Sequence, residues 1–209
     1  MSDQQRHERV DADFRRTFDQ GDYERTAVQF MSQYGREVAA FVADRVGNDG
    51  DASEVFSQFA EDFWRGLPRF AWRTTLRAWA FAVARNAASR HHRSDAKRGS
   101  HRPFSDDSMY GIELARVRTR TQKHLRTEVK SRVRRLRERL SEDDQVLLVL
   151  RVDQGLSFKE LAVAMGGDAE LEATEITRRA TNLRQRFQQV KRRLRQIAVD
   201  EGLLDPSSG

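Results

Sequence analysis

The chain has 209 residues, a net charge of +6 and no cysteine, with 33% charged residues and only 3 prolines. The absence of cysteine excludes a disulfide scaffold, thiolate zinc sites and a cysteine nucleophile. No apolar run approaches the roughly 20 residues of a membrane span, and the polar, acidic N-terminus is unlike a secretory signal peptide. The length accommodates one domain or two small ones, the composition favours helices, and we expect a cytoplasmic protein.

The charge is unevenly distributed along the chain. Residues 1–70 are net −5, residues 71–140 net +13, residues 141–180 net −5 and residues 181–200 net +5. Basic blocks suit phosphate backbones, although a charged run is more often a solvated helix face. The alternation of acidic and basic segments predicts separate surfaces for separate partners. From charge alone, binding to nucleic acid and a merely solvated basic surface are equally good interpretations.

The first two helices that we expect in the N-terminal part have clear ends. Apolar residues recur at helical spacing over residues 28–42, and this helix should end near Gly47. The sequence of residues 51–54, Asp-Ala-Ser-Glu, has the form of a capping box. It predicts the start of a helix that ends at Gly66 and Pro68. About four helices are expected in this part of the chain.

A further helix is predicted over residues 76–93. Its predicted buried face consists of Leu76, Ala80, Val83, Ala84 and Ala87. Its flank carries Trp79, Asn86, Arg90 and Arg93. An aromatic ring, an amide and cations in one strip can stack on unpaired bases and hold their phosphates. The alternative is that Trp79 completes the core and that the arginines are solvated.

A change in composition separates the two parts of the chain. Of the 18 aromatic residues, 16 precede residue 111, which predicts one aromatic core and one aliphatic core. Residues 94–111 contain Gly, Pro, Ser and Asp without a helical apolar period and are predicted to be a linker.

Three or four helices are expected in the C-terminal part. A basic helix with an apolar stripe covers residues 125–140, and residues 141–144 cap the next helix. Residues 157–160, Ser-Phe-Lys-Glu, form a capping box for a short helix that stops at Gly166. The last helix has an apolar seam made of Ile176, Ala180, Leu183, Phe187, Val190, Leu194 and Ile197. We expect this seam to pack on the helix over residues 125–140; a coiled-coil dimer is the alternative. No strand pattern competes, so the predicted fold class is all-α.

A capped short helix, a glycine turn and an arginine-rich helix have the sequence form of a helix-turn-helix. In the last helix the residues free to face outward are Thr177, Arg178, Arg179, Thr181, Asn182 and Arg184. Arginine can donate two hydrogen bonds to guanine, and asparagine can pair with adenine in the same way. A helical hairpin with solvated arginines is the alternative.

Taken together, residues 51–93 and 136–197 resemble an extracytoplasmic-function (ECF) RNA polymerase sigma factor. Residues 51–93 are similar to a σ2 domain, with an Asp-rich start, an amphipathic helix and a Trp-led helix that ends in Ala-Arg-Asn. Residues 136–197 are similar to a σ4 domain with its helix-turn-helix. The resemblance covers roughly residues 26–93 and 121–197. It implies two small helical domains joined by a flexible linker: a σ2-like domain over residues 1–93, a linker over 94–120, a σ4-like domain over 121–199 and a tail over 200–209.

The resemblance also implies a function: binding core polymerase, recognising the −35 and −10 promoter elements and initiating transcription. The residues implied to bind core polymerase are Asp51, Glu54, Gln58, Glu61 and Arg65. Those implied to bind the −10 element are Phe70, Arg73, Trp79, Arg85, Asn86, Arg90 and Arg93, and the loop over residues 70–75 would receive a flipped base. Those implied to bind the −35 element are Ser157, Lys159, Thr177, Arg178, Arg179 and Arg184.

In one place the chain departs from the family pattern. Between Met165 and Ile176 it has about four residues more than the family usually has, which is about one helical turn. The last helix then either begins earlier or follows a longer loop, and which arginine meets which base stays open.

The implied partners are the β′ and β subunits of core polymerase and promoter DNA, and the resemblance also suggests an anti-sigma factor. No membrane insertion, no cofactor and no catalysis by this chain are expected. His91, His92 and His101 could suggest a metal site, but we expect them to be exposed. Two other functions stay open. One is a stand-alone helix-turn-helix regulator with an N-terminal dimerisation or sensing domain, and the other is an enzyme with a helical catalytic domain.

Overall fold

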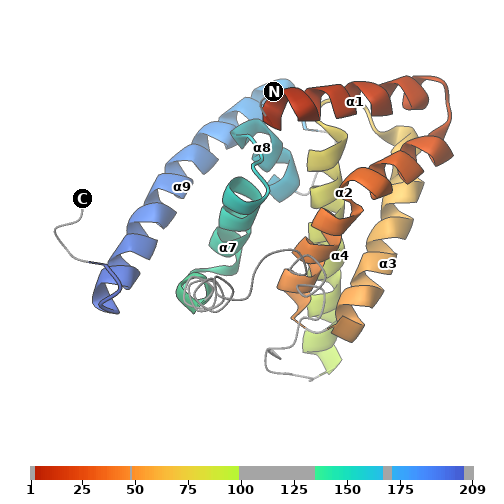
Figure 1. The fold of residues 1–209 in the computed structure, drawn as a ribbon. Helices are drawn as coiled ribbons and strands as arrows, with labels where there is room; N and C mark the ends of the chain where they lie inside the picture. Colours follow the sequence, from red (N-terminus) through yellow and green to blue (C-terminus); the bar gives the residue numbers. More distant parts are fainter. Residues whose placement is uncertain (1–2, 48, 99–134, 167–170, 205–209) are drawn as a thin grey trace, which may run out of the picture.

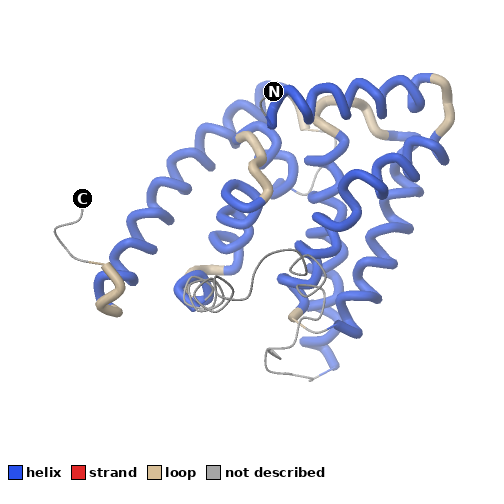
Figure 2. The backbone as a smooth tube through the Cα atoms, viewed as in Figure 1, coloured by secondary structure: helices blue, strands red, loops and turns tan. Residues whose placement is uncertain are grey.

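The computed structural model describes residues 3–47, 49–98, 135–166 and 171–204. Every regular element within these ranges is a helix, which confirms the all-α class (Figure 2). The N-terminal half contains α1 (Asp3–Asp19), α2 (Tyr23–Val46), α3 (Asp49–Gly66), the short 3-10 helix η1 (Leu67–Arg69) and α4 (Leu76–Arg98). The C-terminal half contains α7 (Glu142–Leu148), the π-helix η2 (Val149–Asp153), α8 (Phe158–Gly166) and α9 (Ala173–Asp200). In Figure 1, α7 and α8 lie between α4 and α9.

Local signals set both ends of α2 in the N-terminal half. The Asp22 side chain accepts a hydrogen bond from the Arg25 backbone N–H (3.0 Å) and caps α2, and Gly47 ends this helix with a φ of +82°. A left-handed residue at this position favours glycine, so the predicted end at Gly47 is confirmed. The predicted capping box at residues 51–54 is wrong, because α3 already begins at Asp49 and these residues lie within the helix.

The core of the N-terminal half is a stack of aromatic rings. Phe63 lies 4.6 Å from Phe30 and 5.0 Å from Trp79 between ring centroids, and all three rings are buried. A Cβ added at Gly66 would lie 2.8 Å from the Trp79 ring, so α3 must end on a residue without a side chain here. Val28 is 64% exposed despite its place in the helical period, because no element within the described ranges covers that side of α2.

Helix α4 is buried on more sides than its predicted face. Besides that face, Ala78, Phe81, Ala82 and Ala88 are buried, whereas Val83 is only partly so. The first half of α4, over residues 76–84, is apolar on nearly every side, which is typical of an interior helix, and α4 packs on α2 and α3 as well as on α8. The helix also continues to Arg98, so the first five residues of the predicted linker are helical. Residues 99–134 lie outside the described ranges.

Two predicted caps are confirmed in the C-terminal half. Ser141 caps α7 by accepting a hydrogen bond from the Asp144 backbone N–H. Ser157 and Glu160 form the reciprocal capping box: the Ser157 N–H donates to the Glu160 carboxylate (2.8 Å), and the Glu160 N–H donates to Ser157 Oγ (3.3 Å). Both sequence signals therefore locate their helix starts correctly.

The seam of α9 packs on α7 and α8. Ile176 and Ala180 form a small cluster with Ala162 and Val163 of α8, while later seam residues join the main core. Most of the helix predicted over residues 125–140 lies outside the described ranges. Of its residues that the structure describes, residues 135–138 are helical.

The two halves share one hydrophobic core. Its buried members run from α1 through α4 and continue into α7, α8 and α9. The sequence predicted two small domains joined by a flexible linker. The structure adds that the two halves pack on each other, with α8 of the second half directly on α4 of the first. Within the described ranges, no helix is both long and apolar enough to cross a membrane.

Candidate functional site

The outer face of α3 exposes a polar strip. Glu54, Gln58, Glu61 and Arg65 are exposed, and the side chains of Phe59 and Phe63 are buried behind them. Glu61 pairs with Arg65 one turn away (3.4 Å), and Gln58 donates to Asp62 (3.1 Å). Asp51, the remaining residue predicted for this surface, is partly buried and lies 3.5 Å from His91 Nε2. Four of the five predicted residues thus form one continuous surface.

The two aromatic residues predicted to contact DNA are core residues. Phe70 and Trp79 are 6% and 5% exposed, and their rings stack at 5.1 Å with an interplanar angle of 29°. Trp79 also contacts Phe63 on α3. Neither ring has a free face on which a base could stack, so we do not retain a stacking role for either residue.

The loop between η1 and α4 has an unusual backbone at Trp72, whose φ is +52°. Its ring lies 5.5 Å from Phe18 and 5.0 Å from Phe70, with the Arg15 guanidinium 5.6 Å above it. A positive φ is strained for a bulky residue and is maintained here by aromatic packing. Next to it, the exposed Arg73 pairs with Glu172 at the start of α9 (2.9 Å).

The polar residues predicted to contact DNA lie one after another along α4, and their surroundings change from the C-terminal half to solvent. Arg85 donates to the Met165 carbonyl and to Asp143, each at 3.0 Å, so its guanidinium contacts the C-terminal half. Asn86 is partly buried, whereas Arg90 and Arg93 are more accessible. Arg90 pairs with Asp62 of α3, and Arg93 donates to the Ser89 carbonyl of its own helix. The C-terminal half therefore covers Arg85 and leaves Arg90 and Arg93 accessible.

The start of α9 carries an exposed basic surface. Thr177 and Arg178 are exposed there, Arg184 lies one to two turns further along, Arg179 is partly buried, and Ser157 and Lys159 are at the start of α8. Glu175 accepts hydrogen bonds from Arg178 (2.9 Å) and Arg179 (2.7 Å), and these guanidinium groups lower the pKa of the Glu175 carboxyl to about 2. In the lengthened segment, α9 begins at Ala173, three residues before Ile176, and residues 167–170 are outside the described ranges.

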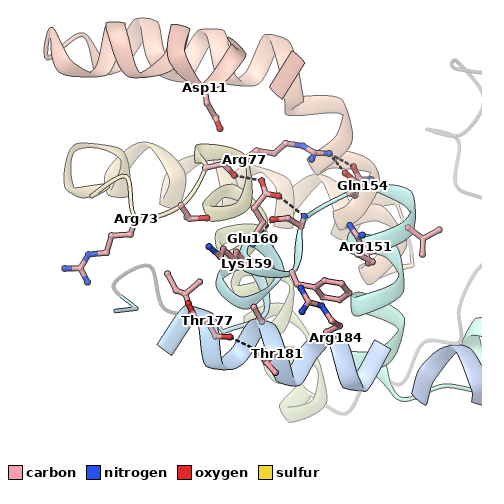
Figure 3. Close-up of a pocket in the computed structure, with 18 of the residues that line it drawn as sticks. Asp11, Arg73, Arg77, Arg151, Gln154, Lys159, Glu160, Thr177, Thr181 and Arg184 are labelled. Carbon is pink, nitrogen blue, oxygen red and sulfur yellow. Dashed lines mark hydrogen bonds between the residues drawn. The ribbon is translucent and has the colours of Figure 1, made fainter. Parts of the chain in front are cut away.

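A groove of about 1390 Å³ lies between the N-terminal half and the start of α9, and Arg73, Lys159 and Thr177 are among the residues that line it (Figure 3). Its lining comes from α1, α2, the loop before α4, α4, η2, α8 and α9. Arg77 lies at its inner wall, almost fully buried, between the rings of Tyr34 (5.2 Å) and Phe81 (5.5 Å). Its guanidinium donates to Glu37 (2.7 Å) and to the Gln154 carbonyl (2.7 Å), which joins α2 and α4 to the C-terminal half. Sequence reasoning missed this residue, and its only signal is one cation in an alanine-rich apolar segment.

Asp11 on α1 also faces this groove. Burial and, to a smaller extent, the nearby Glu160 raise the pKa of its carboxyl, Arg77 and the Leu76 N–H lower it, and the net value is about 6. Its Oδ1 atom is buried and has no hydrogen-bond partner among the described residues. Asp11 therefore loses its proton only near pH 6, and its ionised form is less well stabilised in the folded chain than in the unfolded chain.

An Asp11→Asn variant tests whether the pKa of Asp11 is raised in the folded chain. The pKa of Asp11 is higher in the folded state than its ordinary value of 3.8, so its ionisation has no effect on stability below about pH 3.8, destabilises the fold increasingly from there to about pH 6, and has its full effect above about pH 6. We expect Asp11→Asn to raise the free energy of unfolding by about 1 kcal/mol at pH 7.5 and by little at pH 4. Urea unfolding at both pH values measures this. An equal effect at the two values would contradict the assignment.

The histidines expected to be exposed are partly buried instead. His92 Nε2 lies 3.0 Å from the Arg45 carbonyl oxygen, and His91 packs beside His92 with ring centroids 6.2 Å apart. The approach of α2 to α4 covers them. His101 lies outside the described ranges, and the described residues contain no group of three or more side chains that could hold a metal ion.

Comparisons with known proteins bear on both halves. Residues 30–98, which include most of α2 and all of α3 and α4, match the family model described as Sigma-70 region 2. The chain is also similar to a protein of Pseudomonas aeruginosa described as RNA polymerase sigma-H factor. The two are 25% identical over 170 residues, which cover 78% of this chain and 82% of that protein. The similarity to this protein therefore extends beyond the half that matches the family model.

Proposed function

We propose that this chain, which is an RNA polymerase sigma factor with a Sigma-70 region 2 domain, binds core polymerase through α3 and reads promoter DNA with both halves. The proposal rests mainly on the match of residues 30–98 to the Sigma-70 region 2 family model. This match spans the aromatic-cored half, in which α3 exposes a polar strip beside the basic end of α4. We assign the chain to the ECF class and to the cytoplasm, and we attribute no catalytic step to it.

We assign core-polymerase binding to the exposed strip of Glu54, Gln58, Glu61 and Arg65. The buried aromatic face of the same helix supports this role, because it holds the strip rigidly on the domain. Asp51 contributes indirectly through its contact with His91. The partner surfaces would belong to the β′ and β subunits, and an anti-sigma factor is a further candidate partner for the same strip.

We assign the −10 element to Arg73, Arg85, Asn86, Arg90 and Arg93. These residues lie along the loop over 70–75 and along α4, so their cations and amide could follow one unpaired strand. Phe70 and Trp79 support this surface from beneath as core residues. Among the cations of α4, Arg90 and Arg93 are the more accessible in this structure.

We assign the −35 element to the pair of helices α8 and α9, used as a helix-turn-helix. Ser157 and Lys159 would contact phosphates, and Thr177, Arg178, Arg179 and Arg184 would face the major groove. The exposed side chains at the start of α9 and the packing of Ile176 and Ala180 on α8 support this use. Glu175 orients Arg178 and Arg179 from within the same helix.

A stand-alone helix-turn-helix regulator fits less well. In such a protein the N-terminal half would dimerise or sense a ligand, whereas the Sigma-70 region 2 match lies in that half. Transcription with purified core polymerase and this chain, followed by sequencing of the start sites, distinguishes the two. We expect start sites whose upstream sequences share two separate blocks. Unchanged output without the chain, or a stable dimer that binds duplex DNA without polymerase, would favour the regulator.

Charge reversal on α3 tests the proposed polymerase contact. We expect Glu54→Lys/Glu61→Lys to weaken binding to core polymerase at least about 10-fold, because reversing charges at an interface places like charges together or leaves them unpaired. Fluorescence anisotropy of the labelled chain with core polymerase measures the affinity. The matched control is Asp13→Lys/Asp19→Lys, which reverses two exposed acids of α1. Equal affinities for the two variants would refute the assignment of α3.

A further inference from the structure

The first turns of α9 hold one carboxylate between two arginines. Arg178 donates from Nε to Glu175 Oε2 and from Nη2 to Glu175 Oε1, each at 2.9 Å. Arg179 donates from Nε to Glu175 Oε1 at 2.7 Å. A bidentate bond fixes the plane of a guanidinium as well as its distance from the carboxylate. Glu175 therefore determines the direction in which the Arg178 guanidinium points.

The two arginines point to different sides of α9. The start of the α9 seam packs on α8 and marks the inner side of the helix. At about 100° per residue, Arg178 lies nearly opposite that side, and its side chain is 72% exposed. Arg179 lies closer to α8, its side chain is 34% exposed, and a Cβ added at Gly166 would clash with its guanidinium. Arg178 is thus placed to reach DNA, whereas Arg179 is placed to hold Glu175.

Both members of the Glu175–Arg178 pair keep hydrogen-bonding capacity beyond the bonds that the described residues make. The bonds to Glu175 use the Nε edge of Arg178, so the edge formed by Nη1 and Nη2 still has N–H donors. Glu175 Oε1 accepts from both arginines and is saturated, whereas Oε2 accepts only from Arg178 and has a lone pair left. The pair therefore presents donors directly beside an acceptor.

We propose that Glu175 and Arg178 together recognise one G·C base pair of the −35 element, and that Arg179 is a positioning residue. In the major groove guanine presents the acceptors N7 and O6, and cytosine presents an amino donor. The Nη1–Nη2 edge of Arg178 matches the guanine acceptors, and Glu175 Oε2 matches the cytosine amino group. An A·T pair would instead place the adenine amino group against the Arg178 donors. The inference rests on the proposed function for the identity of the DNA element.

The charge of Glu175 makes its effect on specificity distinct from its effect on affinity. Arg178 and, to a smaller extent, Arg179 lower the pKa of the Glu175 carboxyl to about 2, so this group is ionised at neutral pH. An ionised carboxylate repels DNA phosphates at every sequence and is favourable only where a base presents an amino group. Glu175 should therefore weaken binding to wrong sequences more than binding to the matching base pair, which is a source of specificity.

The test is a selection with holoenzyme, formed from core polymerase and the full chain, on duplex promoters randomised upstream of the start site. Glu175→Gln keeps the length of the side chain and removes its charge. We expect this variant to lower the preference for G·C about 10-fold at one position and to bind the other base pairs there about 3-fold more tightly. Arg178→Lys should lose the preference at the same position, because lysine lacks the planar fork.

Glu201→Gln is the matched control. Glu201 follows the other end of α9 and pairs with Arg139 of the same half (2.7 Å), so this variant also removes the charge of an acid paired with an arginine. It should leave every base preference unchanged. A Glu175 that only stabilised the start of α9 would give lower affinity for all sequences alike in Glu175→Gln. That result, unchanged preferences, or an effect at a different position from that of Arg178→Lys would overturn the inference.

A double-variant cycle tests the positioning role of Arg179. We expect Arg179→Ala to lower the preference for G·C about 3-fold in the unchanged chain and to have no further effect in Glu175→Gln, because Arg179 acts through Glu175. Equal effects of Arg179→Ala in the two backgrounds would show that Arg179 contacts the base pair itself, which would overturn its positioning role.

Titration of the full chain with duplexes from the same library, without polymerase, separates failure of this inference from failure of the proposed function. A chain that directs transcription from defined start sites, but whose base preference does not depend on Glu175, keeps the proposed function and loses the base-reading pair. A chain that gives no transcription, but prefers a G·C duplex through Glu175 and Arg178, keeps the pair, while its role in transcription fails.

Discussion

The Arg77→Ala variant should unfold with a free energy about 2–4 kcal/mol lower than that of the unchanged chain. The Arg77 side chain is almost fully buried, whereas Glu37 is 38% exposed, so the cost comes mainly from the lost packing of Arg77 and from the buried acceptors that lose their donor. Here Glu37 would lose its ion pair, and the Gln154 carbonyl would lose its hydrogen bond. The rings of Tyr34 and Phe81 would also lose the cation that they enclose. Urea unfolding followed by circular dichroism measures the change.

Arg90→Ala is the control for this prediction. Arg90 lies on the same helix and also pairs with an acid, Asp62, but its side chain is 47% exposed. An exposed pair contributes about 0–1 kcal/mol, so this variant should unfold almost as the unchanged chain does. Arg77→Lys should lie between the two, because lysine keeps the charge but lacks the planar fork that reaches two acceptors. Equal losses in the free energy of unfolding for Arg77→Ala and Arg90→Ala would show that the buried contacts of Arg77 do not stabilise the fold more than an exposed ion pair does.

The Phe63→Ala variant should lose about 3–5 kcal/mol of the free energy of unfolding. The Phe63 ring is completely buried and packs against Phe30, Phe59 and Trp79, so truncation leaves a cavity between three rings. Calorimetry or urea unfolding measures the loss. Because these rings support α3 and the start of α4, we also expect weaker binding to core polymerase near the unfolding temperature.

Trp64→Ala provides a neighbouring control. Trp64 follows Phe63 in α3 but is 48% exposed, so removing its larger ring deletes little buried contact. We expect a change in the free energy of unfolding of less than about 1 kcal/mol. A loss comparable with that of Phe63→Ala would mean that the outer face of α3 is covered, which would also count against its use as a polymerase-binding surface.

Local sequence signals predicted helix ends well where the signal is complete within a few residues. Ser141, the Ser157–Glu160 box and Gly47 each form a turn that depends on neighbouring residues alone. Residues 51–54 have the same form as a capping box, but the helix begins before them at Asp49. A capping pattern within a helix-forming segment does not exclude an earlier start, so this prediction was wrong.

The predicted site residues fall into two groups: those whose exposure is set by their own helix, and those whose contacts come from segments distant in the sequence. The exposed strip of α3 follows from the period of a single amphipathic helix, so the pattern of Glu54, Gln58 and Glu61 was sufficient to place them. Trp79 could equally have been a flank or a core residue, and its burial depends on Phe63 and Phe70 from other segments. Arg77 was missed because Glu37 and Gln154 are separated from it by 40 and 77 residues.

The sequence by itself determined the all-α class, most helix ends, the aromatic and aliphatic parts and the resemblance to a sigma factor. The class, the helix ends and the two parts follow from periodicity, capping and composition, which are local properties of the chain. The resemblance rests instead on the motifs of residues 51–93 and 136–197 and on their order. Only the tertiary structure decided that α4 is enclosed by α2, α3 and α8, and that Arg73 and Arg85 pair with acids of the other half. A helical period identifies an apolar face but does not specify how many neighbours will cover the helix. Pairs between distant charges depend on how the two halves pack.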